Sequence, residues 1–148
     1  MSMYLDIFKN QQNITISKDN FLDILNNHIN NLNVPSQLKF IIRYVVLSKF
    51  NKDKVNNYMK KMLTRLFDTV EFAEYFRRIK FSKISHIQFS NRYIILTYIA
   101  PSSWFDSGVL NHYVIGLMDN NKLFIHKIEH GGVVEYKDDG TIRLMQSD

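Results

Sequence analysis

Apolar residues in the first half of the chain recur every three or four positions, which is the period of an amphipathic helix. Polar breaks divide this half into four stretches, so the pattern predicts four helices. Each stretch has candidate starting residues: Ser17 and Asp53 as N-caps of the first and third, Pro35-Ser36 at the start of the second, and Asp68-x-x-Glu71 as a capping box of the fourth.

The second and third stretches carry the strongest apolar patterns. The second contains the β-branched run 41–46, so a strand is an alternative there. The length and the apolar period of the stretch favour a helix. In the third, the apolar residues form the clearest helical face in the chain: Val55, Met59, Met62, Leu63 and Leu66. We therefore expect a helical half over residues 1–83.

After Lys83 the pattern changes to short apolar runs separated by turn residues such as Asp119-Asn120-Asn121 and Gly131-Gly132. The runs predict six strands, at residues 84–89, 93–100, 112–118, 122–130, 133–137 and 141–145. A block of helices followed by a block of strands is typical of the α+β class. We predict one domain over residues 1–148, with about four N-terminal helices packed on one face of a C-terminal antiparallel β-meander of five to six strands.

Hairpin registers across the last three turns divide the strands into two faces. The predicted core face, packed on the helices, collects Tyr113, Ile115, Leu117, Leu123, Ile125, Val134, Tyr136, Ile142 and Leu144. The predicted open face collects His112, Phe124, His126, His130, Glu135, Lys137, Thr141 and Arg143. A slip of one residue in any hairpin would reverse this division for that strand.

The composition of the 148-residue chain favours a folded intracellular domain. Hydrophobic residues make up 45% and aromatic residues 14%, which is enough for a core. There is no cysteine, so neither a disulfide framework nor a thiolate metal site is available. The longest apolar runs fall well short of the roughly 18 residues of a membrane span, and the start does not resemble a signal peptide. We expect a cytoplasmic protein without a membrane partner.

Positive charge is concentrated in residues 36–83. The whole chain carries a formal +5, whereas this stretch has a balance of +8, because twelve basic residues stand there against four acidic ones. Lys outnumbers Arg thirteen to six, and Ile and Asn are abundant, so AT-rich residue usage contributes to the total. Such usage does not explain why the charge is segregated along the chain. The segregation predicts one surface that meets an anion.

A basic stripe on the predicted third helix is the leading candidate site. Cations that surround a tyrosine suit a nucleic-acid backbone, with the ring packed on a sugar or base. Spacings of four, three and four residues place the stripe on one helical face, and two arginines extend it: Lys54, Tyr58, Lys61 and Arg65, then Arg77 and Arg78. We predict a small non-catalytic protein that docks a polyanion, with nucleic acid as the first choice. The open alternative is that the stripe is a solvated helix face.

Histidines and carboxylates on the strands raise the question of metal chemistry. His112 and His126 would be diagonal neighbours about 7–8 Å apart at the backbone, which permits at most a two-histidine site. His130 would lie roughly 13 Å beyond His126 along the strand. A nuclease-like set of Asp119 with Glu135-Tyr136-Lys137 is disfavoured, because Lys137 would lie opposite His126, roughly 23 Å from Asp119 along the strand. We predict no cofactor, with His112 and His126 as the remaining metal candidates and an enzyme as the third hypothesis.

The loop 101–108 contains the adjacent aromatic residues Trp104 and Phe105. Such residues dominate interface hot spots, although they also fold back as lids over sheet edges. The second hypothesis is therefore a protein–protein adaptor or structural subunit, such as a viral or mobile-element accessory protein. It would bind a partner or a second copy through Trp104, Phe105 and the open sheet face. No segment carries a recognisable family motif.

Overall fold

A computed structural model describes residues 12–100, 109–128, 133–136 and 142–145. In chain order the helical segments are α2 (Phe21–Asp23), the π turn η1 (Ile24–His28), the 3-10 turn η2 (Ile29–Asn31), α3 (Ser36–Phe50), the 3-10 turn η3 (Lys52–Lys54), α4 (Asn57–Leu66), α5 (Val70–Arg77) and the 3-10 turn η4 (Phe81–Lys83). The strands are β1 (Gln12–Thr15), β2 (His86–Phe89), β3 (Tyr93–Ala100), β4 (Val109–Leu117), β5 (Leu123–Ile128), β6 (Val133–Tyr136) and β7 (Ile142–Met145). None of the described helices is long and apolar enough to cross a membrane.

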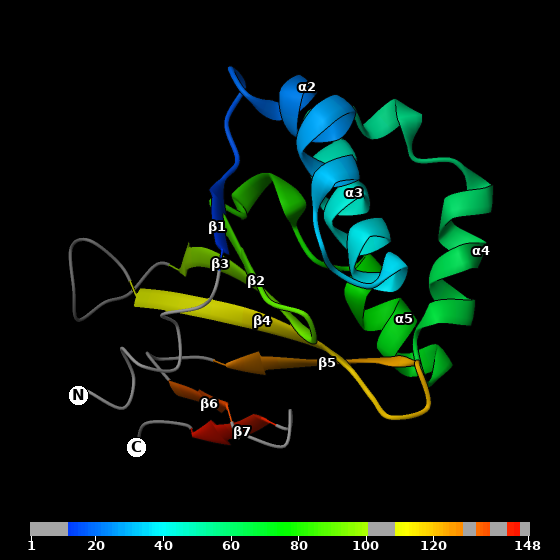
Figure 1. Ribbon diagram of the computed structural model, residues 1–148, viewed down its shortest axis with the longest axis vertical. Helices are drawn as coiled ribbons and strands as arrows, with labels where there is room; N and C mark the ends of the chain where they lie inside the picture. Colours follow the sequence, from blue (N-terminus) through cyan, green and yellow to red (C-terminus); the bar gives the residue numbers. More distant parts are fainter. Residues whose placement is uncertain (1–11, 101–108, 129–132, 137–141, 146–148) are drawn as a thin grey trace.

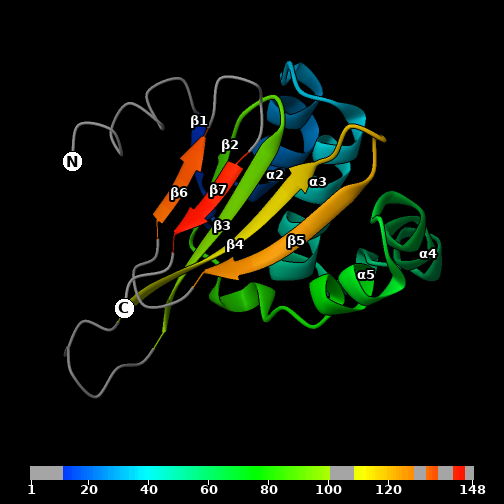
Figure 2. The same ribbon diagram turned by 90° about the horizontal axis from the view of Figure 1, so that it is seen from below.

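The strands form two antiparallel sheets. The larger sheet has the order β1-β2-β3-β4-β5, and β6 and β7 form a separate two-stranded sheet. The helices lie on one side of the larger sheet and β6–β7 on the other (Figures 1 and 2). The predicted α+β class with an antiparallel sheet is confirmed. The predicted single meander of five to six strands is not confirmed. Only β2–β5 follow one another as a meander, and the fifth strand of the larger sheet, β1, precedes the helices in the chain.

The β4–β5 hairpin has the predicted register. The N–H of Met118 donates to the carbonyl of Lys122 at 2.8 Å, which leaves residues 119–121 as a three-residue loop. Asn121 has a φ of 64°, a left-handed conformation that asparagine tolerates better than most residues. The buried pairs are then the predicted ones: Ile115 opposite Ile125, and Leu117 opposite Leu123. The register of β6–β7 also agrees with the prediction.

The predicted hairpin between β5 and β6 is wrong, because β6 leaves the larger sheet. The sheet face predicted to be open is also largely buried. Ile95, Val114 and Ile128 point to that side and are 1%, 0% and 2% exposed. The β6–β7 ladder lies on this side of the sheet, so the face is an inner layer over much of its extent (Figure 2).

Helix α3 is the centre of the helical layer. Its buried side chains span the β-branched run: Leu38, Ile41, Ile42, Tyr44, Val45 and Val46. β-Branched residues cost a few tenths of a kcal/mol each in a helix, whereas full burial of such a side chain contributes about 1.5–3 kcal/mol. Burial therefore outweighs strand propensity, and the predicted helix is confirmed.

The predicted caps are wrong for the first, third and fourth helices. The side chains of Asn56 and Thr69 accept the capping hydrogen bonds of α4 and α5, at 3.0 and 3.1 Å. Asp53 lies in η3 instead, so α4 begins later than predicted. The N–H of Ser17 donates to the side chain of Asn20 at 2.9 Å, and α2 begins after that turn.

The connection between α4 and α5 is attached to the sheet edge. Phe67 forms a β-bridge with Leu123, and the N–H of Asp68 donates to the Leu123 carbonyl at 2.8 Å. The ammonium group of Lys122 donates a hydrogen bond to the carbonyl of Arg65 at 2.6 Å. This carbonyl lies near the end of α4, where the helix dipole favours a cation. The side chain of Asp68 accepts a hydrogen bond from the side-chain amide of Asn120 at 3.2 Å, so it is directed to the β4–β5 loop instead of capping α5.

An aromatic cluster joins the helical segments to one another. The ring of Phe76 in α5 lies 5.4 Å from Tyr44 in α3, 5.4 Å from Phe67 and 5.3 Å from Phe81 in η4, measured between ring centroids. Tyr44 and Phe81 also meet edge-on at 5.7 Å. Phe76 is fully buried, so this cluster fixes the position of α5 and η4 relative to α3.

Replacing Phe76 with Ala should destabilise the fold by about 3–5 kcal/mol, because the change removes buried area and leaves a cavity between three rings. Urea unfolding followed by circular dichroism measures this difference. Val70→Ala on the same helix is the control, since Val70 is 53% exposed and its truncation should change stability by less than about 0.5 kcal/mol. Equal losses in the two variants would contradict the role of the cluster.

Candidate anion-binding groove

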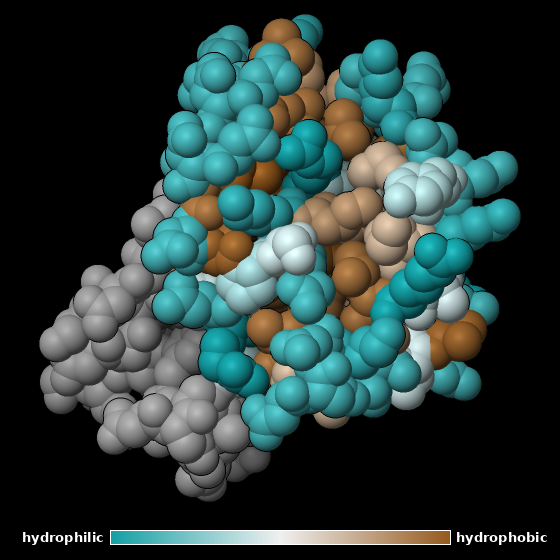
Figure 3. Space-filling view, turned by 45° about the vertical axis from the view of Figure 1, so that its right-hand side comes forward, coloured by the Kyte–Doolittle hydropathy of each residue, from teal (hydrophilic) through white to brown (hydrophobic). Residues whose placement is uncertain are grey.

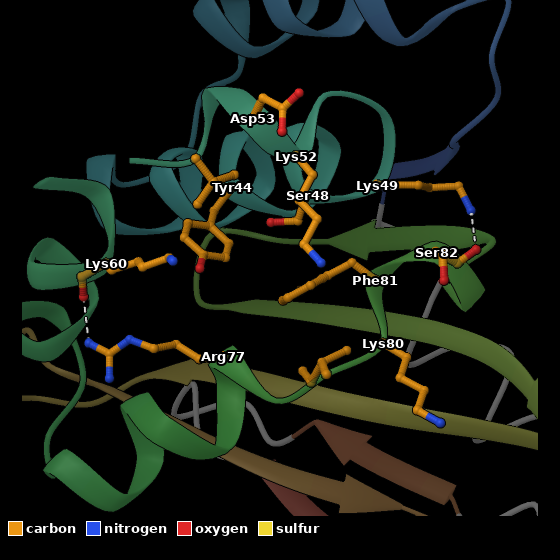
Figure 4. Close-up of a pocket in the computed structure, with 12 residues that line it drawn as sticks. Tyr44, Ser48, Lys49, Lys52, Asp53, Lys60, Arg77, Lys80, Phe81 and Ser82 are labelled. Carbon is orange, nitrogen blue, oxygen red and sulfur yellow. Dashed lines mark hydrogen bonds between the residues drawn. The ribbon is translucent and has the colours of Figure 1, made fainter. Parts of the chain in front are cut away.

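A groove of about 1080 Å³ lies where α3, η3, α4, α5 and η4 converge. Its floor is apolar and includes Tyr44, Ile79 and Phe81, so the aromatic cluster also forms the base of the groove. Among the described residues, five basic side chains line it, against the single carboxylate of Asp53: Lys49, Lys52, Lys60, Arg77 and Lys80. We call this site the basic groove (Figure 4). Its walls are strongly positive, which is the usual footprint of an anion site.

Arg77 forms the wall between α4 and α5. Its guanidinium donates hydrogen bonds to the carbonyl of Lys60 and to the hydroxyl of Thr64. Its buried Nε has no hydrogen-bond partner in the described part of the chain. The pKa of Tyr44 beneath it is raised by burial, which the nearby charge of Arg77 opposes. Arg77 is therefore held in place by α4 and adds a fixed positive charge over a neutral tyrosine.

Lys49 closes another side of the groove. Its Nζ donates to the carbonyl of Ser82 at 2.8 Å and lies 5.4 Å from the ring centroid of Phe50. Burial lowers the pKa of this lysine, although the side chain stays partly exposed. The hydrogen bond ties the end of α3 to η4, so Lys49 contributes to the shape of the groove as well as to its charge.

The remaining cations are exposed and adjustable. In Figure 4, Lys52 reaches from η3 into the hollow and Lys60 extends from α4 towards Tyr44. Lys80 points away from the hollow in the same view. On the face that carries α4 and α5, hydrophilic side chains frame a central band of apolar ones (Figure 3). Long lysines over an apolar floor can follow a bound anion at little cost in strain.

A second, smaller hollow of about 260 Å³ adjoins the groove. It is lined by Arg78, Lys80, Lys83, Tyr98, Tyr113 and Lys127. We call it the tyrosine recess. Lys80 lines both hollows, so one positive surface runs from the basic groove across the end of α5 to the edge of the sheet.

The structure distributes the predicted basic residues over different places. Arg77 lines the groove and Arg78 lines the recess. Lys54 belongs to η3 and is exposed outside both hollows. Three residues of α4 are likewise exposed outside both hollows: Tyr58, which is 65% exposed, Lys61 and Arg65. Lys54 is therefore separate from the helical part of the predicted stripe, because α4 begins only at Asn57, whereas Tyr58, Lys61 and Arg65 follow one another along α4 at the predicted spacing.

The groove residues that the predicted stripe omits are Lys49, Lys52, Lys60 and Lys80. All four lie within the basic stretch 36–83, so the charge distribution was the signal that could have found them. Helical periodicity could not have found these residues, because their side chains come from four different segments. Only the packing of α3, η3, α4 and the connection between α5 and η4 places them together.

The predicted metal candidates lie apart from this site. His112 and His126 are diagonal neighbours on β4 and β5, as predicted. The Nδ1 atom of His112 lies 3.0 Å from the hydroxyl of Thr97, whereas His126 is exposed beside Phe124. Within the described residues, no three His, Asp or Glu side chains are placed to hold a metal ion.

Several other predicted positions fall outside the description. Trp104 and Phe105 lie in the segment 101–108, and His130 and Lys137 also lie outside the described residues. Glu135 is in β6, which does not pair with β5, so the predicted alignment of this strand with His126 is wrong. A comparison of the chain with protein-family models, curated proteins and solved structures finds no match.

His112 should make the fold sensitive to mild acid. Burial lowers its pKa from the ordinary value of 6.5, so the unfolded chain binds a proton at a higher pH than the folded chain does. The stability that neutral His112 contributes is therefore fully present above about pH 6.5. It is lost as the pH falls from there through the pKa of His112 in the folded protein. In His112→Gln, this part of the loss should be absent.

Urea unfolding of both proteins at pH 7.5 and pH 5.0 measures the difference. The carboxylates contribute equally to both proteins, so the wild type should lose more stability than the variant over this interval. Parallel losses would contradict a neutral, half-buried His112.

Proposed function

We propose that this protein docks nucleic acid, as a polyanion, through the basic groove. The observation that carries the proposal is the convergence of five basic side chains around one groove whose described lining contains a single carboxylate. Like charges held this close repel one another in the free protein. An anionic ligand relieves that repulsion and is therefore attracted to this surface before any specific contact forms.

The extent of the positive surface favours a polymer over a small anion. The groove has about 1080 Å³, slightly more than the roughly 300–1,000 Å³ typical of small-molecule sites. Beyond it, Lys80 connects to three further cations: Arg78, Lys83 and Lys127. A ligand with phosphates at regular intervals can contact the groove and this extension together. The sequence has no glycine-rich phosphate loop for a single nucleotide.

Binding without catalysis is the chemistry that the lining supports. Among the described lining residues there is one carboxylate, Asp53, and no histidine. Phosphoryl-transfer sites that use metals place paired carboxylates around the reacting phosphate. The alternative of a protein–protein adaptor gains no observation from the described residues, and its aromatic pair Trp104-Phe105 lies outside them.

The affinity for an oligonucleotide should fall steeply as salt rises, and loss of Lys52 and Lys60 should flatten that dependence. Each phosphate contact contributes about 0.7–0.9 to the slope of log affinity against log salt. The double variant Lys52→Ala/Lys60→Ala should therefore lower the magnitude of the slope by about 1.4–1.8. Fluorescence anisotropy of a labelled oligonucleotide between about 25 and 200 mM salt measures both values.

The matched control is Lys61→Ala/Arg65→Ala, which removes the same charge from α4 outside the groove. Its slope should stay close to that of the wild type. No binding at low salt, or an affinity that does not depend on salt, would refute the proposal. Equal effects of the two double variants would place the ligand outside the groove.

A further inference from the structure

The tyrosine recess differs from the basic groove in its walls. Arg78, Lys80 and Lys83 approach it from the end of α5 and from η4, while Tyr98, Tyr113 and Lys127 come from β3, β4 and β5. None of these described lining residues carries a carboxylate. Arg78 also forms an ion pair with Glu74 at 4.0 Å, but both side chains are exposed, so this pair neutralises little of the charge at the recess.

The two tyrosines form a prearranged pair. Their rings are stacked, with centroids 5.4 Å apart and an interplanar angle of 19°. They are diagonal neighbours on the helix side of the sheet, since Tyr98 pairs with Asn111 and Tyr113 pairs with Leu96. Leu96 is fully buried under the helices, whereas both tyrosines are only partly buried. The aromatic pair therefore lies where the helical layer ends.

Hydrogen bonds hold the pair in this position. The side-chain amide of Asn111 donates to the Tyr98 hydroxyl at 3.3 Å. Burial tends to raise the pKa of Tyr98, but hydrogen bonds with Asn111, Tyr113 and Lys127 lower it overall. Burial and the same tyrosine–tyrosine hydrogen bond raise the pKa of Tyr113.

Two further contacts surround Tyr113. The ammonium group of Lys127 lies 5.9 Å from the centroid of its ring, and the ring of Tyr75 meets it edge-on at 6.1 Å. A pair fixed in this way loses little conformational freedom when a planar group binds beside it. Aromatic rings next to cations are the features by which proteins bind unpaired bases.

We propose that the ligand of the basic groove is single-stranded nucleic acid, with one unpaired base in the tyrosine recess beside Tyr98 and Tyr113. This inference rests on the proposed function of the groove. The recess, at about 260 Å³, is too small for a base pair and its backbones, but a single ring system is of suitable size. Because Lys80 lines both hollows, the base and the phosphates in the groove can belong to one strand.

The test compares three ligands with the same number of phosphates at one salt concentration: an oligo(dT) strand, a strand of abasic sites of the same length, and a blunt DNA duplex of about half that length. The wild type should bind oligo(dT) about tenfold more tightly than the other two, because only an exposed base can stack. This comparison needs no variant. Equal affinities for the three ligands, or a preference for the duplex, would overturn the inference.

The variant Tyr98→Leu removes the ring and keeps much of the apolar bulk. It should bind oligo(dT) about tenfold more weakly, with an unchanged salt slope and an unchanged affinity for the abasic strand. Tyr98→Phe is the matched control, since it keeps the ring and should keep most of the affinity. An oligo(dT) affinity that Tyr98→Leu leaves unchanged, in a variant with a normal melting temperature, would also overturn the inference.

The two proposals fail in different ways. If the abasic strand and oligo(dT) both fail to bind at low salt, the groove is not a polyanion site and the proposed function falls. If both bind with equal affinity and a steep salt dependence, the proposed function of the groove is supported and the proposed role of the recess is refuted.

Discussion

The aromatic cluster around Phe76 is the constraint on which the rest of the helical layer depends. Its four rings come from α3, α5, η4 and the end of α4, and Tyr44 and Phe81 are shared with the floor of the basic groove. The same packing that buries the rings therefore places the basic side chains of these segments around one hollow. Attachment of Phe67 to Leu123 at the sheet edge fixes the outer wall. The groove is thus a consequence of how the core is closed.

The charge of this surface is stabilised by protein contacts only in part. Arg77 is held by Lys60 and Thr64, and Lys49 is held by Ser82, all through uncharged acceptors. Such hydrogen bonds position cations without neutralising them. The groove therefore keeps its net positive charge in the folded protein. A ligand that neutralises this charge should stabilise the fold as well as bind, because it interacts with the native state alone.

The elements of the fold could be predicted from the sequence where a local pattern decides them. The period of α3, the registers of β4–β5 and β6–β7, and the α+β class all follow from apolar spacing and turn residues. The helix starts could not be predicted in the same way, because Asn56 and Thr69 compete with nearby Asp53 and Asp68 as caps. For Asp68, a hydrogen bond from the remote Asn120 side chain to its carboxylate decides the outcome. The pairing of β1 with β2 and the departure of β6 depend on contacts remote in sequence. The groove also depends on contacts remote in sequence, since its cations come from separate segments.

The most direct test of the groove as the docking site is a two-dimensional NMR titration of the labelled protein with a short single-stranded oligonucleotide. The chain has a mass of 17.6 kDa, which suits such spectra. Binding at the groove predicts that the largest amide shifts occur at residues 48–53, at Lys60 and at residues 77–82. Largest shifts at Tyr58, Lys61 and Arg65, or on the β6–β7 side of the sheet, would contradict it.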